Sequence, residues 1–402
     1  MLDLSDRLAR TMRVAHYCQA FSQLSETAIY TWTTELQRQG VDGHVVTHER
    51  LNADQRPFPS VRVVPRPRVT DFDRLGWHLL ETIGSKSEAG SWTTTLQKRL
   101  TKALASVGPE VVHAHFGNDA WLALPAVAAV GAPLVVTFHG YDISELMEDE
   151  VWRRRYRDDL WPAASFVTVL SEEMREAAQR YGCPEEKIRI VRVGRPIDEM
   201  PVREHEPEGR FTLVSIGRLS AKKGHEDTVH AIARLVAEGR SPLLRIFGGG
   251  EMQDQLRDLV EQLRLGDCVR LEGACPNDTV LEALRNAHGF VLCSKTAPNG
   301  DREGTPNVFV EAQGMGLPCV STWHAGIPEM IPEQGHALLA AEGDVDQITD
   351  RIRKLMEMPS EDRLALGALG HEKMKREYDL ETECNAFREL YSEALSTRTS
   401  HA

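Results

Sequence analysis

Hydrophobic positions along the chain fall into short apolar runs that alternate with longer amphipathic stretches. The runs Arg13–Cys18 and Leu134–Phe138 are rich in β-branched residues, which is typical of buried parallel strands. An amphipathic stretch from about Glu26 ends at Gly40, as helices commonly do, and a second strand follows near residues 44–47. This strand–helix–strand opening predicts a right-handed parallel unit and hence an α/β fold.

The same alternation restarts after a polar segment, residues 198–209, whose two prolines are typical of a linker. A length of 402 residues is comfortable for two domains. We therefore expect one domain over residues 1–200, a second over residues 210–380, and a C-terminal helix in residues 381–402. Further expected elements are the strands Phe211–Ile216, Leu243–Phe247 and Val269–Glu272 and helices near residues 344–357 and 361–396.

One strand–loop–helix segment in the second half holds the densest candidate chemistry. A buried strand, Phe290–Leu292, leads into a polar loop that contains Glu303. Pro306 suits the first position of the helix that follows, where its missing N–H costs nothing. That helix is expected to run through Glu311 to about Gly316.

The start of this helix could hold a nucleotide. Its first N–H groups, on Asn307 and Val308, have no partner within the helix and suit a phosphate. Glu311 lies one turn deeper on the face of Asn307, where its carboxylate could accept hydrogen bonds from ribose hydroxyls. Glu303 could reach a sugar, so the pattern suits a nucleoside diphosphate-sugar. The alternative is that Glu303 is merely solvated and Glu311 merely occupies a helix position.

Two long cations follow the first strand of the second half. Arg218 and Lys223 lie in a loop bounded by Gly217 and Gly224, at the carboxyl end of a strand. Arginine offers a forked donor and lysine a point charge, and together they suit a diphosphate. The alternative is a solvated turn.

A histidine occupies a comparable position in the first half. His139 directly follows the strand Leu134–Phe138, and ligands of open α/β sheets bind beyond the carboxyl ends of the strands. A functional histidine and a hydrogen-bonded loop histidine are both compatible with this pattern.

Composition narrows the class of protein. A net charge of −13 argues against nucleic acid as a partner. Seven cysteines without CxxC pairs or metal-ligand spacing favour a reducing cytosol and no metal site. The first turn lacks the G-x-G-x-x-G pattern, so no dinucleotide cofactor is expected. The leader up to Met12 is polar rather than a signal peptide, and Met12 itself is an alternative start.

Two stretches raise the question of a membrane. Residues 120–138 lack charge over nineteen positions, but Pro125 and Gly131 interrupt them, so we expect a helix, a turn and a strand. Residues 151–161 combine four arginines with Trp152, Tyr156 and Trp161. They suit an anionic acceptor or a membrane surface, or simply form a solvated helix face. Any membrane contact is expected to be peripheral.

These motifs, in this order, resemble the retaining glycosyltransferases of family 4, which have the GT-B fold. The chain is most similar to the branch that builds exopolysaccharides of the colanic-acid and amylovoran type. The matching pieces are VVHAHFG at 111–117, VTFHGYD at 136–142, GRLSAKKG at 217–224, FGGGE at 247–251, EGTPNVFVEAQGMGLPCVST at 303–322 and HAGIPE at 324–329.

The resemblance implies two Rossmann-like domains facing across a cleft, with a last helix that crosses back onto the first domain. It implies catalytic roles for Glu303, His139, Arg218 and Lys223. The residues that it assigns to the donor are Gly217, Arg218, Lys223, Gly273, Ala274, Cys275, Glu303, Gly304, Thr305, Pro306, Asn307, Val308 and Glu311, and those on the acceptor side are Gly117 and Asp142.

One region departs from the resemblance. Many relatives have a Gly-Gly loop after the first strand, near the donor phosphate, whereas this chain has Ser22 to Thr27 there. The Ser-Glu-Thr sequence within it suits the exopolysaccharide branch.

The resulting hypothesis is a cytoplasmic retaining hexosyltransferase that acts at most at the inner face of the membrane. It would use a nucleoside diphosphate-sugar, with UDP favoured over GDP, and a carbohydrate or lipid-linked acceptor. No metal or other cofactor is expected, because the cations supply the positive charge. The rival hypotheses are a nucleotide-sugar 2-epimerase of the same fold and a non-catalytic nucleotide-sugar-binding protein.

Overall fold

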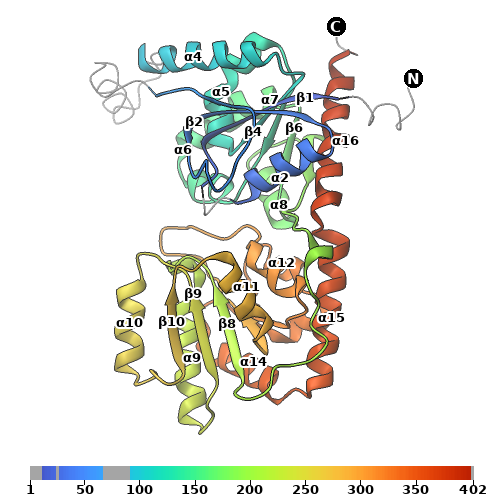
Figure 1. The fold of residues 1–402 in the computed structure, drawn as a ribbon. Coiled ribbons are helices and arrows are strands. Elements are labelled where there is room, and N and C mark those ends of the chain that lie inside the picture. The colour runs from blue at the N-terminus through green and yellow to red at the C-terminus, as the bar shows by residue number, and fades with distance from the viewer. Residues whose placement is uncertain (1–10, 24–26, 67–90, 400–402) are drawn as a thin grey trace. The chain divides into compact units, whose positions relative to one another are not determined.

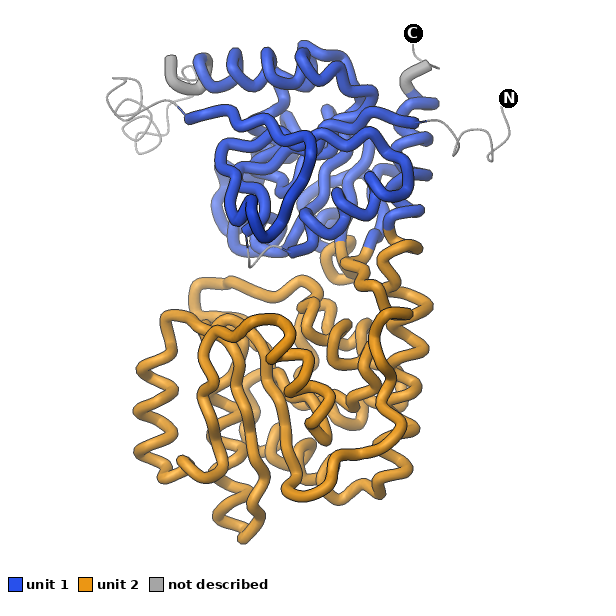
Figure 2. Tube along the Cα trace, in the orientation of Figure 1, with its two compact units in different colours: residues 1–169, 177–191, 384–402 blue, residues 170–176, 192–383 orange. Residues whose placement is uncertain are grey.

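Two separate parallel sheets organise the chain. The structure is a computed structural model that describes residues 11–23, 27–66 and 91–399. It forms two compact units: unit 1, residues 1–169, 177–191 and 384–402, and unit 2, residues 170–176 and 192–383 (Figure 2). The chain contributes residues 170–176 to unit 2, returns to unit 1, and re-enters unit 2 at Arg192, a few residues before the polar segment 198–209; its last residues belong to unit 1.

Unit 1 contains a seven-stranded parallel sheet among its described residues, in the order β3-β2-β1-β4-β5-β6-β7 (Figure 1). Its strands are β1 (Arg13–Phe21), β2 (Asp42–Arg50), β3 (Val61–Val63), β4 (Val111–His115), β5 (Leu134–Thr137), β6 (Phe166–Val169) and β7 (Ile188–Ile190). The helices that connect or cover them are α2 (Thr27–Arg38), α4 (Ser91–Val107), α5 (Gly117–Val130), α6 (Glu150–Arg155), α7 (Trp161–Ala163), α8 (Glu172–Arg180) and α16 (Leu380–Thr399).

Unit 2 contains a six-stranded sheet, in the order β10-β9-β8-β11-β12-β13. Its strands are β8 (Thr212–Ile216), β9 (Leu243–Phe247), β10 (Val269–Gly273), β11 (Gly289–Val291), β12 (Cys319–Thr322) and β13 (Leu339–Ala340). Its helices are α9 (His225–Ala237), α10 (Gln253–Gln262), α11 (Asn277–Arg285), α12 (Asn307–Gly314), α13 (Ile327–Met330), α14 (Val345–Glu357) and α15 (Ser360–Glu377).

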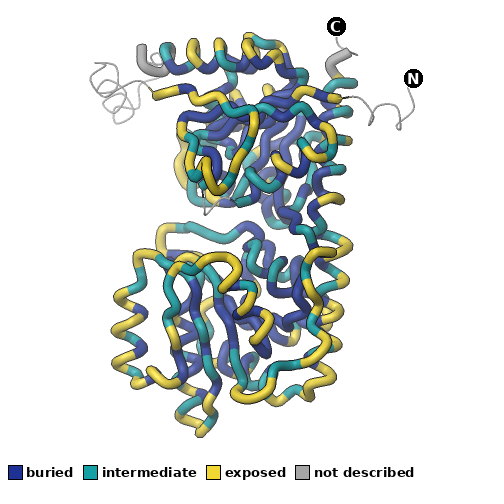
Figure 3. The backbone as a smooth tube through the Cα atoms, viewed as in Figure 1, coloured by how far each residue is buried: buried dark blue, intermediate teal, exposed yellow. Residues whose placement is uncertain are grey.

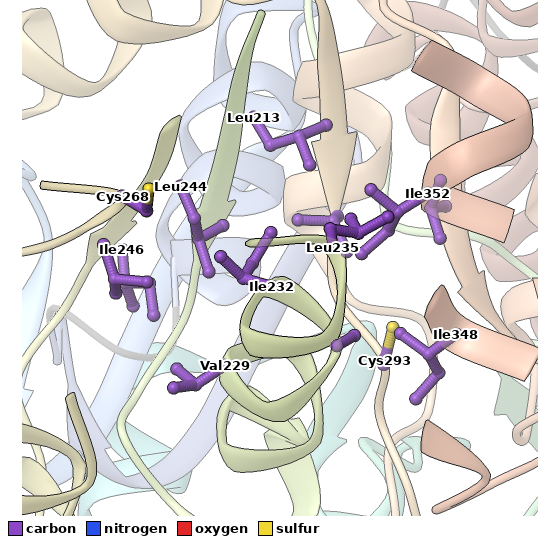
Figure 4. Close-up of a cluster of buried hydrophobic side chains, with 14 of the residues drawn as sticks. Leu213, Val229, Ile232, Leu235, Leu244, Ile246, Cys268, Cys293, Ile348 and Ile352 are labelled. Carbon is purple, nitrogen blue, oxygen red and sulfur yellow. The ribbon is translucent and has the colours of Figure 1, made fainter. Parts of the chain in front are cut away.

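The sheet of unit 2 has a separate apolar core on each face, because neighbouring strand residues point to opposite sides. Leu213 packs with α9 and α14 in one cluster, drawn in Figure 4, and Val214 packs with α11 and α12 in the other. Both side chains are fully buried, and Figure 3 shows the same burial along the central strands of the unit. Burial of each such side chain contributes roughly 2 kcal/mol. Continuous apolar strands are therefore required here, as the sequence pattern predicted.

The uncharged stretch from residue 120 to 138 is a helix, a turn and a strand, as expected. Helix α5 contains Pro125 and ends at Gly131, whose φ of 65° is left-handed, and β5 follows. Within the part of the chain that the structure describes, no helix is both long and apolar enough for a membrane span.

Two expected helix boundaries are wrong. Pro306 is the N-cap of α12 and not its first helical residue, because its ψ of 115° is extended. The single helix expected over residues 361–396 is two helices that break at Asp379. Asp379 pairs with Arg195 in a parallel β-bridge, and its carboxylate accepts the N–H of Thr382 at the start of α16. A partner almost 200 positions away causes this break, without the glycine or proline that would mark it locally.

Candidate active site

The loops after β8 and β11 lie side by side at the carboxyl edge of the unit 2 sheet. β8 and β11 are neighbours in the sheet, but the chain continues from β8 to β9 on one side and from β11 to β12 on the other. Open α/β sheets bind ligands at the carboxyl ends of two strands that are related in this way. Lys223 ends the first loop and Glu303 lies in the second. Lys223 Nζ is 3.0 Å from Glu303 Oε1, and the two side chains are only 13% and 8% exposed. The structure thus brings together two residues that are 80 positions apart in the chain.

This ion pair keeps Glu303 ionised. Burial alone would raise the pKa of Glu303, but Lys223, followed by Lys222, lowers it below the usual value. Lys222 in turn donates from Nζ to Asp301 Oδ1 at 2.9 Å, which holds the middle of the β11 loop against the β8 loop. A carboxylate and an ammonium group therefore face the same small region, each partly shielded from water.

Glycine makes this close approach of the two loops possible. Gly224 has a φ of 62°, and a Cβ there would lie 1.8 Å from the carbonyl oxygen of Cys293. Gly248, with a φ of 140°, would similarly bring a Cβ to 1.9 Å from the Gly217 carbonyl oxygen. Only a residue without a side chain fits at either position. Gly224 and Gly248 therefore set the backbone geometry around Lys223.

The start of α12 presents unpartnered polar groups beside Glu303. Pro306 provides no side chain to cap the helix, so among the described residues no side chain caps the first N–H groups of the helix, on Asn307 and Val308. Thr305 Oγ1 and Asn307 Oδ1 are buried and have no hydrogen-bond partner among the described residues. A helix N-terminus and free donors favour an anionic, oxygen-rich ligand.

Glu311 is one turn further along α12 and has a partner that the sequence did not indicate. Arg195 Nε donates to Glu311 Oε1 at 3.3 Å, and both side chains are largely buried. Arg195 is fixed by its own backbone, which bonds with Tyr378 and Leu380. The pair is separated by 116 positions, so no local spacing could have revealed it.

The other donor residues expected from the sequence occupy the same edge of the sheet. Arg218 is exposed, and its guanidinium makes no ion pair or hydrogen bond with the rest of the described chain. Gly273 ends β10, where its carbonyl accepts the N–H of Gly248 at 2.8 Å, and Ala274 and Cys275 follow. His225, which the sequence analysis missed, is buried beside Lys223, and burial, followed by Lys223, lowers its pKa to about 4.

The expected residues of unit 1 are also drawn together. Asp142 is buried, and its Oδ2 accepts the N–H of Gly117 at 2.9 Å. Its Oδ1 accepts the N–H groups of His139 and Gly140 at 2.9 and 3.0 Å. Burial raises the pKa of Asp142 to about 6, although these bonds act in the opposite direction. Asp142 therefore ties the loop after β5 to the start of α5.

The side chain of His139 is held by rings rather than by hydrogen bonds. Its ring lies 4.4 Å from that of Phe116 and 5.9 Å from that of Trp32. Its Nε2 is buried without a partner among the described residues. Burial lowers its pKa to about 3, so the imidazole is neutral at pH 7. Only the backbone N–H of His139 is hydrogen-bonded in its loop, so a functional and a structural histidine both remain compatible with this arrangement.

A second group of histidines is buried next to this one. His16, His113 and His115 offer ring nitrogens within 4.8 Å of one another, close enough to reach one metal ion. However, both nitrogens of His113 are already engaged, with the Tyr391 hydroxyl at 2.7 Å and the Thr137 hydroxyl at 2.6 Å. Metal binding would have to break one of these bonds, so we interpret the group as a packed layer of neutral imidazoles.

The arginine-rich segment at residues 151–161 is partly tied to its own surroundings. The guanidinium carbon of Arg155 lies 4.3 Å from the ring centroid of Trp121 and 4.6 Å from that of Trp152. Arg154 and Arg157 are exposed, and Arg157 pairs with Asp158. Both possibilities raised by the sequence, a solvated face and an anion-binding surface, remain compatible with this arrangement.

Two family models match consecutive parts of the chain. The model described as "Glycosyltransferase Family 4" matches residues 25–199, and the model described as "Glycosyl transferases group 1" matches residues 196–372. Their boundary coincides with the passage of the chain into unit 2.

Individual relatives are similar at moderate identity. The chain is 29% identical over 273 residues to the putative colanic acid biosynthesis glycosyltransferase WcaL of Escherichia coli K12, which covers 67% of either chain. It is 32% identical over 247 residues to the amylovoran biosynthesis glycosyltransferase AmsK of Erwinia amylovora, over 60% of either chain.

Solved structures share the fold at lower identity. The structure of HepE from Anabaena in complex with UDP and glucose superposes with a TM-score of 0.73 and 16% identity, over 95% of this chain and all of that one. Sucrose-phosphate synthase from Thermosynechococcus elongatus gives a TM-score of 0.72 at 18% identity, over 96% of this chain and all of that one.

Proposed function

Because the chain belongs to the GT-B glycosyltransferases, with a family 4 region followed by a group 1 region, we propose that it transfers a hexose with retention of anomeric configuration. The donor is a nucleoside diphosphate-sugar, and the acceptor is a carbohydrate or a lipid-linked carbohydrate. Similarity to WcaL and AmsK supports a role in exopolysaccharide or related glycoconjugate synthesis.

The observation that carries this proposal is the arrangement of Lys223 and Glu303 beside the uncapped start of α12. A diphosphate bound there would meet Lys223, the exposed Arg218 and the N–H groups of Asn307 and Val308. Glu311, held by Arg195, would accept hydrogen bonds from the ribose hydroxyls. Gly273 to Cys275, at the end of β10, would meet the base. Glu303 would then lie beside the donor sugar.

The transfer exchanges one bond at the anomeric carbon for another. The bond from this carbon to the diphosphate oxygen breaks, and its electron pair leaves with the diphosphate. An acceptor hydroxyl attacks from the same face, and its proton passes to the departing phosphate oxygen. Lys223, Arg218 and the α12 N-terminus stabilise the charge that grows on the diphosphate more strongly in the transition state than before it.

Glu303 has the opposite task in this scheme. The anomeric carbon gains positive character as the bond breaks, and a nearby carboxylate offsets it. Glu303 is suited to this because its pKa lies below the usual value and it is ionised at neutral pH. His139 is neutral, and its buried Nε2 has no partner among the described residues, so we propose that this imidazole contacts the sugar.

We further propose that the reaction needs no metal ion. The lysine, the arginine and the helix N-terminus supply the positive charge that a bound cation would otherwise provide. Turnover is expected to be unchanged after removal of divalent cations with a chelator. A loss that added Mg²⁺ or Mn²⁺ restored would contradict this part of the proposal.

Uridine is the first choice of base and guanosine the second, and the UDP held by HepE supports this order. The decisive experiment incubates the purified protein with a panel of UDP- and GDP-sugars without acceptor. Donor hydrolysis and the shift in melting temperature are measured together. Slow hydrolysis and stabilisation by one donor are expected.

The same experiment separates the rival functions. A 2-epimerase would convert the sugar nucleotide into its C2 epimer without releasing the nucleoside diphosphate. A binding protein would be stabilised without any turnover. If no nucleotide or sugar nucleotide changed the melting temperature, the donor site proposed on unit 2 would be wrong.

A further inference from the structure

Both ends of the loop that carries Glu303 are attached to the carboxylate of Glu342, one directly and the other through His324. At the beginning of the loop, the N–H of Thr296 donates to Glu342 Oε2 at 2.8 Å. At its end, the N–H of Glu303 donates to His324 Nε2 at 3.1 Å, and His324 Nδ1 lies 2.7 Å from Glu342 Oε1. Glu342 follows β13, and His324 follows β12, so two neighbouring strands of the sheet supply this attachment.

The hydrogen bonds fix the state of His324. Its Nε2 accepts from a backbone N–H and therefore carries no proton. Its Nδ1 must then carry the proton and donate it to the Glu342 carboxylate. Burial would raise the pKa of Glu342, but the bonds from Thr296 and His324 lower it, so this carboxylate is ionised. His324 is fully buried, so its two hydrogen bonds are shielded from water.

The backbone next to His324 adds a second connection to the same loop. The N–H of Gly326 donates to the carbonyl of Gly304 at 3.3 Å. A Cβ at Gly326 would lie 3.0 Å from Thr305 Cγ2 and 2.8 Å from Ser171 Cβ. The segment after β12 therefore lies directly against the residues that follow Glu303.

We propose that His324 and Glu342 form a positioning pair that holds the Glu303 backbone, and with it the Glu303 carboxylate, at the reacting centre. The pair touches no substrate and acts only through Glu303. This inference rests on the proposed function, because it takes Glu303 to be the group beside the donor sugar. Displacement of a catalytic group by about 1 Å can cost about 10²-fold in rate, so a fixed loop matters for turnover.

Two substitutions of one residue separate the two hydrogen bonds of His324. In His324→Gln, an amide oxygen replaces the Nε2 acceptor for the Glu303 N–H. In His324→Asn, the shorter amide still reaches Glu342 but cannot reach Glu303. The kcat of transfer is expected to fall about tenfold or more in His324→Asn and to remain within about threefold in His324→Gln. The affinity for the nucleoside diphosphate is expected to be unchanged in both.

A double-mutant cycle tests whether His324 acts through Glu303. If it does, Glu303→Ala with His324→Asn is no slower than Glu303→Ala alone, because the group being positioned is already gone. His336→Asn serves as the matched control. His336 bonds with the Pro328 carbonyl and packs against the Trp323 ring, away from Glu303 and Glu342 in these interactions, and its substitution is expected to leave turnover unchanged. Additive losses, or equal losses in the Gln and Asn variants, would overturn the proposal.

Amide hydrogen exchange provides a readout that does not depend on activity. In the unliganded protein, the Glu303 amide is expected to exchange about tenfold faster in His324→Asn than in the wild type or in His324→Gln. If the wild type turned over no sugar nucleotide but this difference persisted, the proposed function would fail while the attachment itself stood. Unchanged exchange in all three proteins would overturn the attachment.

Discussion

At the scale of single residues, Lys223 and Glu303 are each other's counter-ions until a donor arrives. Both are largely buried, and a buried charge is stable only when it is paired. A bound diphosphate would compete for Lys223, and the donor sugar would then lie next to Glu303. The residues of the proposed reaction are thus kept ionised and in place by their own attraction.

The first prediction concerns this pair. Lys223→Ala and Glu303→Ala are each expected to lower kcat by about 10²–10³-fold, because each removes a charge that stabilises the transition state in the proposed mechanism. Steady-state kinetics measures the effect, and circular dichroism checks that the fold survives. Lys354→Ala changes an exposed lysine on α14 and is the matched control. Wild-type rates in both site variants would contradict the assignment of the site.

The second prediction concerns the buried histidines of unit 1. Burial lowers the pKa of His16 and His139 to about 3 and that of His113 and His115 well below the usual value. The unfolded chain therefore binds more protons than the folded one below the ordinary histidine pKa of about 6.5. Stability from neutral histidines is fully present above that pH and is lost as the pH falls towards 3.

Thermal denaturation between pH 7.5 and 5 measures this loss. Each buried histidine contributes up to about 1.4 kcal/mol of destabilisation per pH unit below about 6.5. Asp142 acts in the opposite direction, because its pKa is raised to about 6 in the folded protein. Between its unfolded and folded pKa values it binds a proton only in the folded state, which offsets the effect of one histidine. The variant His115→Gln is expected to show a shallower dependence than the wild type. An identical slope in the two proteins would contradict the assignment to these residues.

At the scale of elements, the loop after β8 is shaped by backbone packing rather than by side chains. Gly224 places its Cα against the carbonyl of Cys293, two residues after the end of β11, and α9 starts immediately after Gly224. The position of Lys223 therefore depends on contact between two backbones. This explains why a glycine follows the two lysines in the segment that the sequence analysis singled out.

The third prediction compares two glycines with similar conformations. Gly224 and Gly239 both have positive φ, 62° and 82°, but only Gly224 would place a Cβ against backbone. Gly239→Ala is expected to cost about 1 kcal/mol in unfolding free energy and to keep turnover. Gly224→Ala is expected to cost about 3 kcal/mol or more and to lower kcat at least tenfold, because the β8 loop must move. Chemical denaturation and kinetics measure both. Equal effects of the two changes would contradict the packing argument.

The elements themselves were largely predictable, and the contacts between them were not. Apolar, β-branched runs identified the strands around Val14, Val135, Val214 and Phe290, because parallel strands are buried on both faces. The break at Asp379 and the pairs Arg195–Glu311 and Lys223–Glu303 depend on residues 80 or more positions apart. Helix and strand periods report only on local burial, so such pairs follow from the sheet order and not from any spacing in the sequence.

At the candidate site, the recognised sequence motifs predicted more residues than the hydrophobic periodicity did. The glycines and both lysines of residues 217–224 lie in the loop that follows β8, and the residues from Glu303 to Glu311 include the start of α12. His324 lay within the recognised segment HAGIPE, yet its role could not be read from it. That role depends on Glu342, which belongs to none of the recognised segments.

At the scale of the whole molecule, unit 1 is discontinuous. Residues 384–402 belong to it, although all of residues 192–383 form unit 2. Within unit 1, Phe387 of α16 lies 5.2 Å from the ring of Trp32, and Tyr391 bonds with His113. Both α16 side chains are fully buried. The last helix is therefore part of the core of the first domain.

The fourth prediction follows from this discontinuity. A fragment of residues 1–191 is expected to be unfolded or aggregated, because Trp32 and the three neighbouring histidines lose their cover. Adding a peptide of residues 380–399 in trans is expected to restore helical circular dichroism and protease resistance. The same peptide with Phe387→Ala and Tyr391→Ala is the control. A fragment that folds cooperatively by itself would contradict the prediction.

The position of Phe387 and Tyr391 also has a consequence for how the protein is made. A ribosome releases the N-terminal sheet long before it reaches codon 384, so β1 to β7 wait with an incomplete core while unit 2 is translated. Unit 2, whose segments follow one another closely, is able to finish first. We therefore expect unit 2 to complete its fold before unit 1 during synthesis, and the incomplete N-terminal sheet to need chaperones in that interval.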